Sequence, residues 1–584
     1  MSAAPQKPGW PAMSIAQAHA LLTQPGSPLE MEEVVIRGIK TRVWKNAPPT
    51  IRHLLQIGRT HGNKEFLVYE NDRATYESFT RAALAIADEL TKQGVRKGDR
   101  VALIMRNLPE WPAIFFGAEI IGAIVTPLNA WWTGPELEYG LVDSGSKIAF
   151  TDAERLERIS EHLINCPDLK RVYVCRYSDD LPNPMVCRLE EVTGAVNGWS
   201  KLPDRPMPTI EIQPDDDATI LYTSGTTGKP KGALGTHRNM LSNIFASASA
   251  IARNFLRRGE MPPAPDANAP QRCTLLSVPF FHATGCFAVM GPTVFAGGKL
   301  VLMRKWDPEI AMQLIEREKV NSAGGVPTIA WQLIEHPARP KYDLSSLESV
   351  AYGGAPSAPE LVRKIVEVFP KSLPGNGWGM TETSATCTTH SAEDYENRPD
   401  SCGPAVPVCD IKIMSVDGLR ELPRGEVGEL WARGPNIVKG YWNKPEATAA
   451  TFVDGWVKTG DLARMDEEGF CYIIDRAKDM LIRGGENIYC IEVENVLYEH
   501  PAVMDAALVP VPHKTLGEEP GAVVHLKPGM HASEDELRQF VAGKLAAFKV
   551  PVKIVFWPET LPRNANGKIM KTELKKVFSE HLHG

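Results

Sequence analysis

Tyr-Thr-Ser-Gly-Thr-Thr-Gly-Lys-Pro-Lys-Gly, residues 222–232, is the stretch that constrains the fold and chemistry of this chain most. Its hydroxyl side chains supply hydrogen-bond donors, and its glycines let the backbone curl around an anion, because only glycine reaches positive φ without steric cost. The stretch follows the apolar pair Ile220 and Leu221. This pattern predicts a polyphosphate-binding loop at the end of a strand.

The spacing of this loop differs from that of a Walker loop. A Walker loop has two glycines separated by four residues, then a lysine and a Ser or Thr that opens a helix. Here Pro230 follows Gly228 and Lys229, where the magnesium-binding hydroxyl would stand, and Gly232 begins a strand-like run. We therefore expect nucleotide binding without Walker-type hydrolysis. A Gly/Ser/Thr-rich surface turn is the alternative interpretation.

The composition indicates more than one domain and no nucleic-acid-binding face. A chain of 584 residues is long for a single hydrophobic core. Its formal net charge is −7, and Lys and Arg do not cluster into the basic stripe that phosphate backbones require. The ten cysteines lack metal-ligand spacing. This predicts reduced thiols and no structural zinc.

No stretch has the pattern of a membrane span or a secretory signal. The most apolar runs, 113–125 and 278–303, are interrupted by Glu119 in the first and by His282 and Pro292 in the second, so we expect buried core instead. The proline-containing N-terminus lacks the basic and apolar segments of a signal peptide. We expect a cytoplasmic enzyme. Peripheral contact with a membrane and a homodimer stay open as alternatives.

Strand-like and helix-like segments alternate along most of the chain, which predicts an α/β fold with layers around largely parallel sheets. Thr236 is a good N-cap for the longest of the helices near the phosphate loop. The expected strands are 100–105, 147–151, 274–278 and 299–303, and the expected helices are 78–93, 237–255 and 359–369.

After Asp475 the pattern changes to that of a compact α+β unit. We expect a helix near 491–500, strands at 503–511 and 522–526, and a helix capped by Ser533 and Glu536. The predicted organisation is an N-terminal extension (1–45), a large layered α/β domain (46–475), a hinge (476–479) and a small mobile α+β domain (480–584).

Seven further motifs follow the phosphate loop in order. They are Pro279-Phe-Phe-His-Ala-Thr-Gly, Tyr352-Gly-Gly-Ala-Pro, Gly377-Trp-Gly-Met-Thr-Glu-Thr, Gly428-Glu-Leu-Trp-Ala-Arg-Gly, Lys458-Thr-Gly-Asp, Asp475-Arg-Ala-Lys-Asp and Pro562-Arg-Asn-Ala-Asn-Gly-Lys568. From about residue 50 to the C-terminus, the chain resembles the adenylate-forming enzymes: acyl-CoA synthetases, adenylation domains of peptide synthetases, and luciferases. The resemblance implies activation of a carboxylic acid by ATP to acyl-AMP with release of pyrophosphate, then transfer to CoA.

The resemblance also implies a nucleotide site. Its phosphate loop would comprise Thr223, Ser224, Gly225, Thr226, Thr227, Gly228 and Lys229. The adenine walls would be Gly354, Ala355, Pro356, Gly377, Trp378, Gly379 and Met380, with Trp378 in place of the more usual tyrosine. Thr381 would contact the α-phosphate, Glu382 and Thr223 would bind Mg²⁺, and Asp461 and Arg476 would hold the ribose and phosphates.

For catalysis, the resemblance implies that Lys568 bridges the attacking carboxylate and the α-phosphate, and that Lys478 is the hinge around which the small domain rotates. The pair Gly484 and Gly485 would line the passage for the CoA arm; a simple glycine turn is the alternative. His282 would be a gate to the adenylate, or else a buried, satisfied histidine. The acyl pocket would include His282, Ala283, Thr284, Gly324 and Gly325.

Three functions compete at this point. An AMP-forming acyl-CoA synthetase acting on a hydrophobic acid is favoured, with a medium- to long-chain fatty acid preferred over an aryl or steroid-like acid. An adenylating enzyme that passes its acyl group to a carrier protein or an amine is the second, but Phe281 and His282 stand where peptide synthetases offer an acidic residue to the amino group. A non-catalytic or luciferase-like relative is the third, and the presence of Lys568, Glu382 and Asp461 disfavours it.

Overall fold

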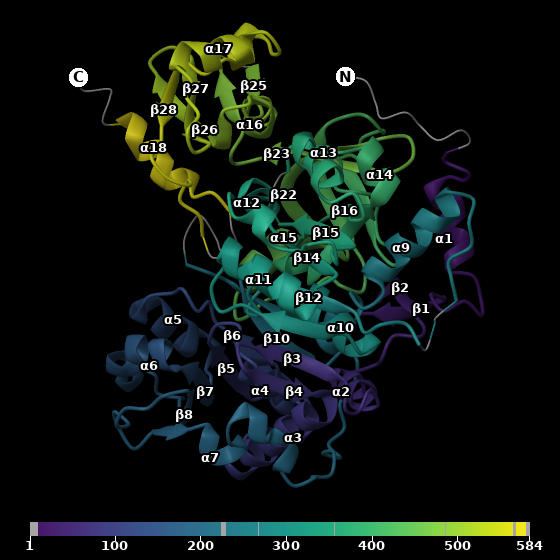
Figure 1. Cartoon of the computed structure of the whole chain (residues 1–584), viewed down its shortest axis with the longest axis vertical. Coiled ribbons are helices and arrows are strands. Elements are labelled where there is room, and N and C mark those ends of the chain that lie inside the picture. The colour runs from purple at the N-terminus through teal and green to yellow at the C-terminus, as the bar shows by residue number, and fades with distance from the viewer. Residues whose placement is uncertain are drawn as a thin grey trace.

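The computed structural model describes residues 10–223, 229–264, 266, 268–354, 357–484, 486–564 and 568–579. A large α/β domain carries a smaller α+β domain at its C-terminal end (Figure 1). The sequence-based prediction of the fold class is therefore confirmed. Among the described residues, no helix combines the length and the hydropathy needed to cross a bilayer. All ten cysteines are free thiols, as expected.

One eight-stranded sheet carries the predicted phosphate loop at its antiparallel edge. Strands β6, β5, β7 and β8 pair side by side in parallel. Strands β10 and β11 form an antiparallel hairpin that flanks the predicted loop. The order is β20-β11-β10-β6-β5-β7-β8-β9, with β5 (Arg100–Ile104), β6 (Ile124–Pro127), β7 (Ile148–Asp152), β8 (Arg171–Cys175), β9 (Val186–Arg188), β10 (Asp217–Tyr222), β11 (Gly232–Thr236) and β20 (Gly440–Tyr441).

A second eight-stranded sheet supplies the floor of the site described below. Its central strands are parallel, and β17 closes one edge in antiparallel pairing with β16. The order is β17-β16-β15-β14-β12-β13-β3-β4, with β3 (Glu65–Tyr69), β4 (Asp72–Thr75), β12 (Cys273–Leu276), β13 (Lys299–Leu302), β14 (Ser322–Gly325), β15 (Ser349–Gly353), β16 (Leu373–Met380) and β17 (Ala385–Ser391).

Helices cover and separate these sheets. Helix α4 is buried along its whole length, which confirms that the apolar run around 113–125 is core, with Glu119 buried inside it. The helices of the large domain are α2 (Ile51–Arg59), α3 (Tyr76–Lys92), α4 (Glu110–Glu119), α5 (Gly134–Ser144), α6 (Ala153–Ile159), α7 (Glu190–Thr193), α8 (His237–Leu241), α9 (Ala246–Arg257), α10 (Gly291–Ala296), α11 (Pro308–Glu318), α12 (Pro327–Glu335), α13 (Pro359–Val368), α14 (Ala392–Asn397) and α15 (Pro445–Thr451).

The prediction of a single helix over 237–255 is wrong in one respect, because the structure has two helices there, α8 and α9. Thr236 caps α8 as predicted, accepting a hydrogen bond from Asn239 N at 3.2 Å. The break comes at Asn243, whose side chain donates to the carbonyl of Asn239 at 3.4 Å, while its own backbone N–H bonds to the carbonyl of Met240 at 3.1 Å. An Asn side chain that competes for helical carbonyls ends a helix locally.

A third sheet leads from the large domain to the small one. It comprises β18 (Asp410–Met414), β19 (Gly428–Arg433), β21 (Phe452–Val453), β22 (Trp456–Met465) and β23 (Cys471–Arg476). The small domain follows with β24 (Leu481–Arg483), β25 (Glu486–Ile488), α16 (Cys490–Tyr498), β26 (Val503–His513), β27 (Gly517–Leu526), α17 (Glu534–Ala542), β28 (Lys553–Phe556) and α18 (Lys571–Ser579). Ser533 and Glu536 form the predicted capping box.

The described part of the segment before residue 45, residues 10–44, packs on the large domain. It forms α1 (Ile15–Leu22) and the hairpin of β1 (Met31–Ile36) and β2 (Ile39–Trp44). Helix α1 lies beside α9, on the flank of the large domain (Figure 1). Trp44 is buried and donates from its indole to the carbonyl of Ser242 at 3.1 Å, which anchors the hairpin next to the α8–α9 break.

Candidate functional site

One continuous cavity of about 1160 Å³ gathers most of the predicted site residues. Ser224, Gly225, Thr226, Thr227, Gly228, Ala355, Pro356 and Gly485 lie outside the described residues. Lys229, Asp461 and Gly484 do not line the cavity itself. The predicted residues that do line it are Thr223, His282, Ala283, Thr284, Gly324, Gly325, Gly354, Gly377, Trp378, Gly379, Met380, Thr381, Glu382, Arg476, Lys478 and Lys568.

Two lysines stand at the C-terminal side of the phosphate loop, each over an aromatic face. Lys229 Nζ lies 5.0 Å from the ring centre of Tyr139, and Lys231 Nζ lies 4.3 Å from that of Tyr441. The backbone N–H of Thr223 donates to the carbonyl of Lys231 at 2.9 Å, which closes the base of the loop. Cation–π contact holds an ammonium in place without neutralising it, so both charges remain able to attract a polyphosphate.

Glu382 is a buried carboxylate at the end of β16, in the short helical turn Thr381–Thr383. The Tyr441 hydroxyl donates to its Oε1 at 2.6 Å. Burial and the adjacent Glu382 charge raise the pKa of Tyr441 well above its ordinary value, so the phenol remains a donor. Within the described residues, no three His, Cys, Asp or Glu side chains form a metal cage. A single carboxylate fits Mg²⁺ that keeps water and phosphate ligands.

Asp461 is held between two donors from different strands. Trp378 Nε1 donates to Oδ2 at 2.8 Å, and Arg476 Nε lies 3.1 Å from Oδ1. The pairing of β22 with β23 brings Asp461 directly opposite Arg476. Because a carboxylate can accept about four hydrogen bonds, Asp461 retains capacity for two neighbouring hydroxyls such as those of a ribose.

Lys568 enters the cavity from a loop of the small domain. Its backbone N–H donates to Asn564 Oδ1 at 3.1 Å, and its carbonyl accepts from Asn564 N at 2.9 Å. Arg563 bonds both carboxylate oxygens of Asp505 at 2.7 Å each, which fixes the same loop to β26. Burial, with Arg476 nearby, lowers the pKa of Lys568 to about 8. Its ammonium charge is therefore present at neutral pH and easily lost above it.

His282 lines the cavity close to Lys568. Following the prediction from the sequence, we call the part of the cavity around Glu382 and Lys568 the nucleotide end and the part over β14 and β15 the acyl end. The Nε2 atom of His282 is buried and has no hydrogen-bond partner among the described residues. Burial, and after it the charge of Lys568, lowers the pKa of His282 to about 3. The imidazole is therefore neutral at physiological pH. The unpartnered ring nitrogen of His282 can therefore donate one hydrogen bond to a substrate or accept one from it, but the neutral ring supplies no charge.

The floor of the acyl end is formed by strands β14 and β15 in the central part of the second sheet, where small residues line the cavity. Ser349, Ala351 and Gly353 are alternate residues of β15 and line the cavity, as do all four residues of β14. Ala351 is solvent-accessible although β15 is an interior strand, because it faces this empty space. Small residues on one face of neighbouring strands therefore create the cavity.

Gly324 and Gly325 contribute backbone to this floor, at positions where a side chain is not accommodated. Their φ angles are +155° and +140°. A Cβ on Gly324 would lie 1.6 Å from the carbonyl oxygen of Ala351, and one on Gly325 would lie 2.8 Å from Ser277 Oγ. These glycines are required by the sheet itself. A larger residue at Gly325 would strain the backbone before it shortened the cavity.

The predicted hinge follows β23 directly. Lys478 lines the cavity at its solvent-exposed edge, where partial desolvation and then the charge of Arg476 lower its pKa. Asp475, one residue before Arg476, is 2% exposed and accepts from the backbone N–H of Cys490, the first residue of α16. Burial raises the pKa of Asp475 to about 7. Gly484 lies in a turn away from the cavity, donating to the carbonyl of Leu516 at 2.8 Å.

Several residues of the site were not found from the sequence. Tyr441 reaches Glu382 only because β20 pairs with β11, and no nearby motif marks it. Asn564 belongs to one of the motifs quoted above, but its two hydrogen bonds to the backbone of Lys568 depend on the conformation of the loop. Ala351 and Ser349 have no sequence signal except alternation with the buried Val350 and Tyr352. The far wall, made by Ser247, Ala250 and Ile251 of α9, depends on tertiary packing.

The chain is similar to known proteins over most of its length. The family model "AMP-binding enzyme" matches residues 55–442, and "AMP-binding enzyme C-terminal domain" matches residues 492–568. A long-chain-fatty-acid–CoA ligase of Bacillus subtilis is 35% identical over 539 residues, covering 89% of this chain and 93% of the relative. A feruloyl-CoA synthase of an Amycolatopsis species is 34% identical, covering 86% and 94%. The anthranilate CoA ligase AuaEII, solved with anthranoyl-AMP, superposes with a TM-score of 0.78 at 25% identity, covering 90% and 97%.

Proposed function

The chain belongs to the family of AMP-binding enzymes and is an acyl- or aryl-CoA ligase with ATP and CoA as substrates, and we propose that its acid substrate is a medium- to long-chain aliphatic acid. The alternatives are an aryl or steroid-like acid, and transfer of the acyl group to a carrier protein or an amine instead of CoA. The relatives named above act on aliphatic and on aromatic acids, so their names do not decide between these.

The length of the cavity floor is the observation that carries the proposal. Lining residues run from Ser349 at the start of β15 to Gly353 at its end, and from Ser322 to Gly325 along β14. Four steps of a strand span ~13 Å. The cavity also reaches α9 at Ile251, whose side chain lines it and is 49% exposed. A space this long with an open end suits a flexible chain better than a single ring.

In the proposed adenylation step, the acid lies on the β14–β16 floor with its carboxylate near His282 and Lys568. One carboxylate oxygen attacks the α-phosphorus of ATP, and the bond from that phosphorus to the pyrophosphate oxygen breaks. Lys568 offers its ammonium to the charge that develops between carboxylate and phosphate. Thr381 contacts the α-phosphate, and Asp461 holds the ribose. Bound Mg²⁺, with Glu382 and Thr223 as its protein ligands, would neutralise phosphate charge.

In the proposed second step, the small domain turns about Lys478. The turn withdraws Lys568 and brings the β24–β25 turn with Gly484 and Gly485 toward the acyl-adenylate, where the CoA thiol displaces AMP. Two features support a rotation at this point. The backbone between β23 and β24 is short, and its flanks are joined to α16 through two hydrogen bonds of Cys490, to the Asp475 carboxylate and to the Asp479 carbonyl, which a rotation can break and remake.

A panel of acids tests the substrate proposal. AMP release is measured with ATP, Mg²⁺ and CoA for straight-chain acids of increasing length, and for ferulate, benzoate and a steroid acid at matched concentrations. We expect kcat/KM to rise with chain length until the tail fills the floor, with ring acids well below the best aliphatic acid. Omission of CoA should leave adenylate formation but stop turnover. A preference for an aryl acid, or full turnover with an amine in place of CoA, would contradict the proposal.

A further inference from the structure

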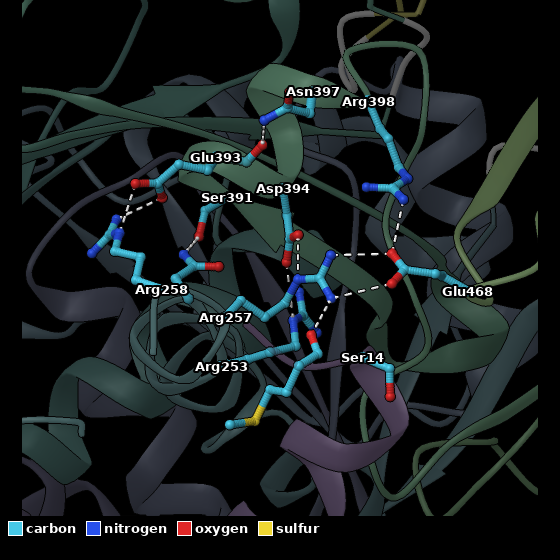
Figure 2. Close-up of polar contacts among 12 residues, drawn as sticks. Ser14, Arg253, Arg257, Arg258, Ser391, Glu393, Asp394, Asn397, Arg398 and Glu468 are labelled. Carbon is cyan, nitrogen blue, oxygen red and sulfur yellow. Dashed lines mark hydrogen bonds and ion pairs between the residues drawn. The ribbon is translucent and has the colours of Figure 1, made fainter. Parts of the chain in front are cut away.

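The distal wall of the acyl cavity is joined to the N-terminal segment by a buried charge network. Helix α9 lines the cavity with Ser247, Ala250 and Ile251 in its first two turns. Its last turns carry Arg253 and Arg257, both 1% exposed. We use the name arginine clamp for the side chains of Arg253, Arg257, Asp394 and Glu468, which Figure 2 shows meeting around Arg257, together with the carbonyl of Met13.

Arg257 uses its guanidinium to join three parts of the chain. Its Nε bonds Asp394 Oδ1 of α14 at 2.6 Å. One terminal nitrogen donates to the carbonyl of Met13 at 2.8 Å, and the other lies 3.1 Å from Glu468 in the β22–β23 turn (Figure 2). The ring of Trp10 lies 5.2 Å from the guanidinium carbon. A planar donor group with fixed directions suits a joint of this kind.

Arg253 ties α9 to β17, which packs beside it. It donates to the carbonyl of Thr389 in β17 at 2.8 Å and lies 3.6 Å from Asp394. Its third contact is His19 Nε2 of α1, at 3.2 Å. Burial, and then Arg253 itself, lowers the pKa of His19 to about 3, so this imidazole is a neutral acceptor. Thr389 lines the cavity, so one arginine connects both cavity walls to the N-terminal segment.

The clamp does not touch the chemical end of the cavity. None of its side chains lines the cavity, whereas Lys568, Glu382 and Arg476 all do. Arg253 and Arg257 face the carboxylates of Asp394 and Glu468, and Arg398 also bonds Glu468 at 2.8 Å. Removing one member of a buried ion pair leaves its partner unpaired and shifts the elements that carry it. A shift of α9 relative to β17 changes the width of the distal cavity and leaves the nucleotide site in place.

We propose that the arginine clamp sets the width of the distal acyl cavity, and that Arg257 is thereby a positioning residue for the acyl tail. The N-terminal segment from Trp10 to His19 then takes part in substrate selection through α9, although none of these residues lines the cavity. The proposal rests on the proposed function only in taking the acid's tail to lie between α9 and β17.

The test compares Arg257→Gln and Glu468→Gln with the control Arg258→Gln in the full-length protein. Arg258 lies on the same helix and pairs with Glu393 at 2.6 and 2.7 Å, but it has no contact with the N-terminal segment or Glu468 among the bonds described. KM and kcat are measured by AMP release with one short and one long straight-chain acid. Thermal unfolding of each variant is recorded in parallel.

For Arg257→Gln we expect KM for the long acid to rise about tenfold, the cost of losing contact with one or two methylenes. For Glu468→Gln, whose side chain is 27% exposed, we expect about threefold. The short-acid KM and both kcat values should stay near wild type, and Arg258→Gln should keep the wild-type ratio of long- to short-acid KM. Equal loss for both acids in the two clamp variants, as general destabilisation would give, overturns the proposal.

The two proposals fail in different ways. If kcat/KM of the wild-type enzyme does not rise with the chain length of the acid, the proposed substrate is wrong. If kcat/KM of the wild type does rise with chain length, and both clamp variants show the same preference for the long acid, the clamp does not select the substrate. Should Arg257→Gln fail to fold, Glu468→Gln decides, since it keeps a hydrogen-bond acceptor at the turn and removes only the charge.

Discussion

The two ends of the cavity are built by different means. At the nucleotide end, charged and polar side chains meet from three separate regions: Glu382 after β16, Arg476 at the end of β23 and Lys568 on the small domain. At the acyl end, the walls are strand backbone and small residues such as Ala351, and the exact shape depends on where α9 lies. The nucleotide end therefore depends on which charged and polar residues are present, whereas the acyl end depends on the small size of the residues that line it.

The largest effect that separates the two ends is expected for Lys568→Ala. Loss of one preorganised charge at the α-phosphate should lower adenylate formation by roughly 100- to 1000-fold. Thioester formation from a supplied acyl-adenylate should stay close to wild type, because Lys568 serves only the first step. Both half-reactions are followed separately, with Lys576→Ala, an exposed lysine of α18, as the control. An equal fall in both half-reactions would show that Lys568 has a different role.

The acyl end should respond to bulk at Ala351, which can accept a side chain where Gly325 cannot. Ala351→Leu should exclude about three methylenes of a long tail at about 0.8 kcal/mol each, a loss on the order of fiftyfold in kcat/KM. A short acid should be unaffected. Ser349→Leu, further along β15, should exclude only the longest acids. If both variants reduce all acids alike, this face of β15 does not hold the tail.

Lys478→Pro should separate the two steps at the hinge. Proline fixes φ, so the small domain should stay near one orientation. Adenylate formation should persist while CoA-dependent turnover falls on the order of tenfold. The measurement is pyrophosphate release without CoA beside AMP release with CoA. An unchanged rate with CoA would place the pivot elsewhere.

The pH dependence of the first step should report Lys568. Its folded-state pKa of about 8 lies below the ordinary value of 10.5, so the ammonium is lost as pH rises through 8. The kcat/KM of adenylation should therefore fall above pH 8, by about tenfold per unit at the limit. In Lys568→Arg, whatever its absolute rate, this alkaline limb should vanish, because arginine stays charged. A limb that persists in Lys568→Arg belongs to another group.

The smallest effect is expected at Trp378. Trp378→Phe keeps a ring beside the adenine site and removes only the donor to Asp461. The net value of such a hydrogen bond is about 1 kcal/mol, so KM for ATP should rise about fivefold. The KM for the acid should be unchanged, which binding assays with each substrate can check. A change confined to the acid would mean that Trp378 belongs to the acyl end.

Local patterns predicted much of the fold. Strand-like apolar runs located β5, β7, β12 and β13 to within a residue or two, and the Ser533–Glu536 spacing located the start of α17. The break between α8 and α9 was missed, because Asn243 donates to the carbonyl of Ser384, just before β17, at 2.6 Å as well as to its own helix. That contact joins residues 141 positions apart, and no local pattern carries it.

By itself, the sequence determined the fold class, the two domain types and the family, because glycines, hydroxyls and charges at fixed spacings are chemical requirements of a phosphate site. It also indicated which carboxylates and lysines to examine. Tertiary structure alone decided that Tyr441 bonds Glu382, that the β14 glycines exclude side chains and that α9 is braced by residues 10–19. The physical reason is that cavity shape and ion-pair partners depend on distances between segments far apart in the chain, whereas periodicity and motif spacing are local.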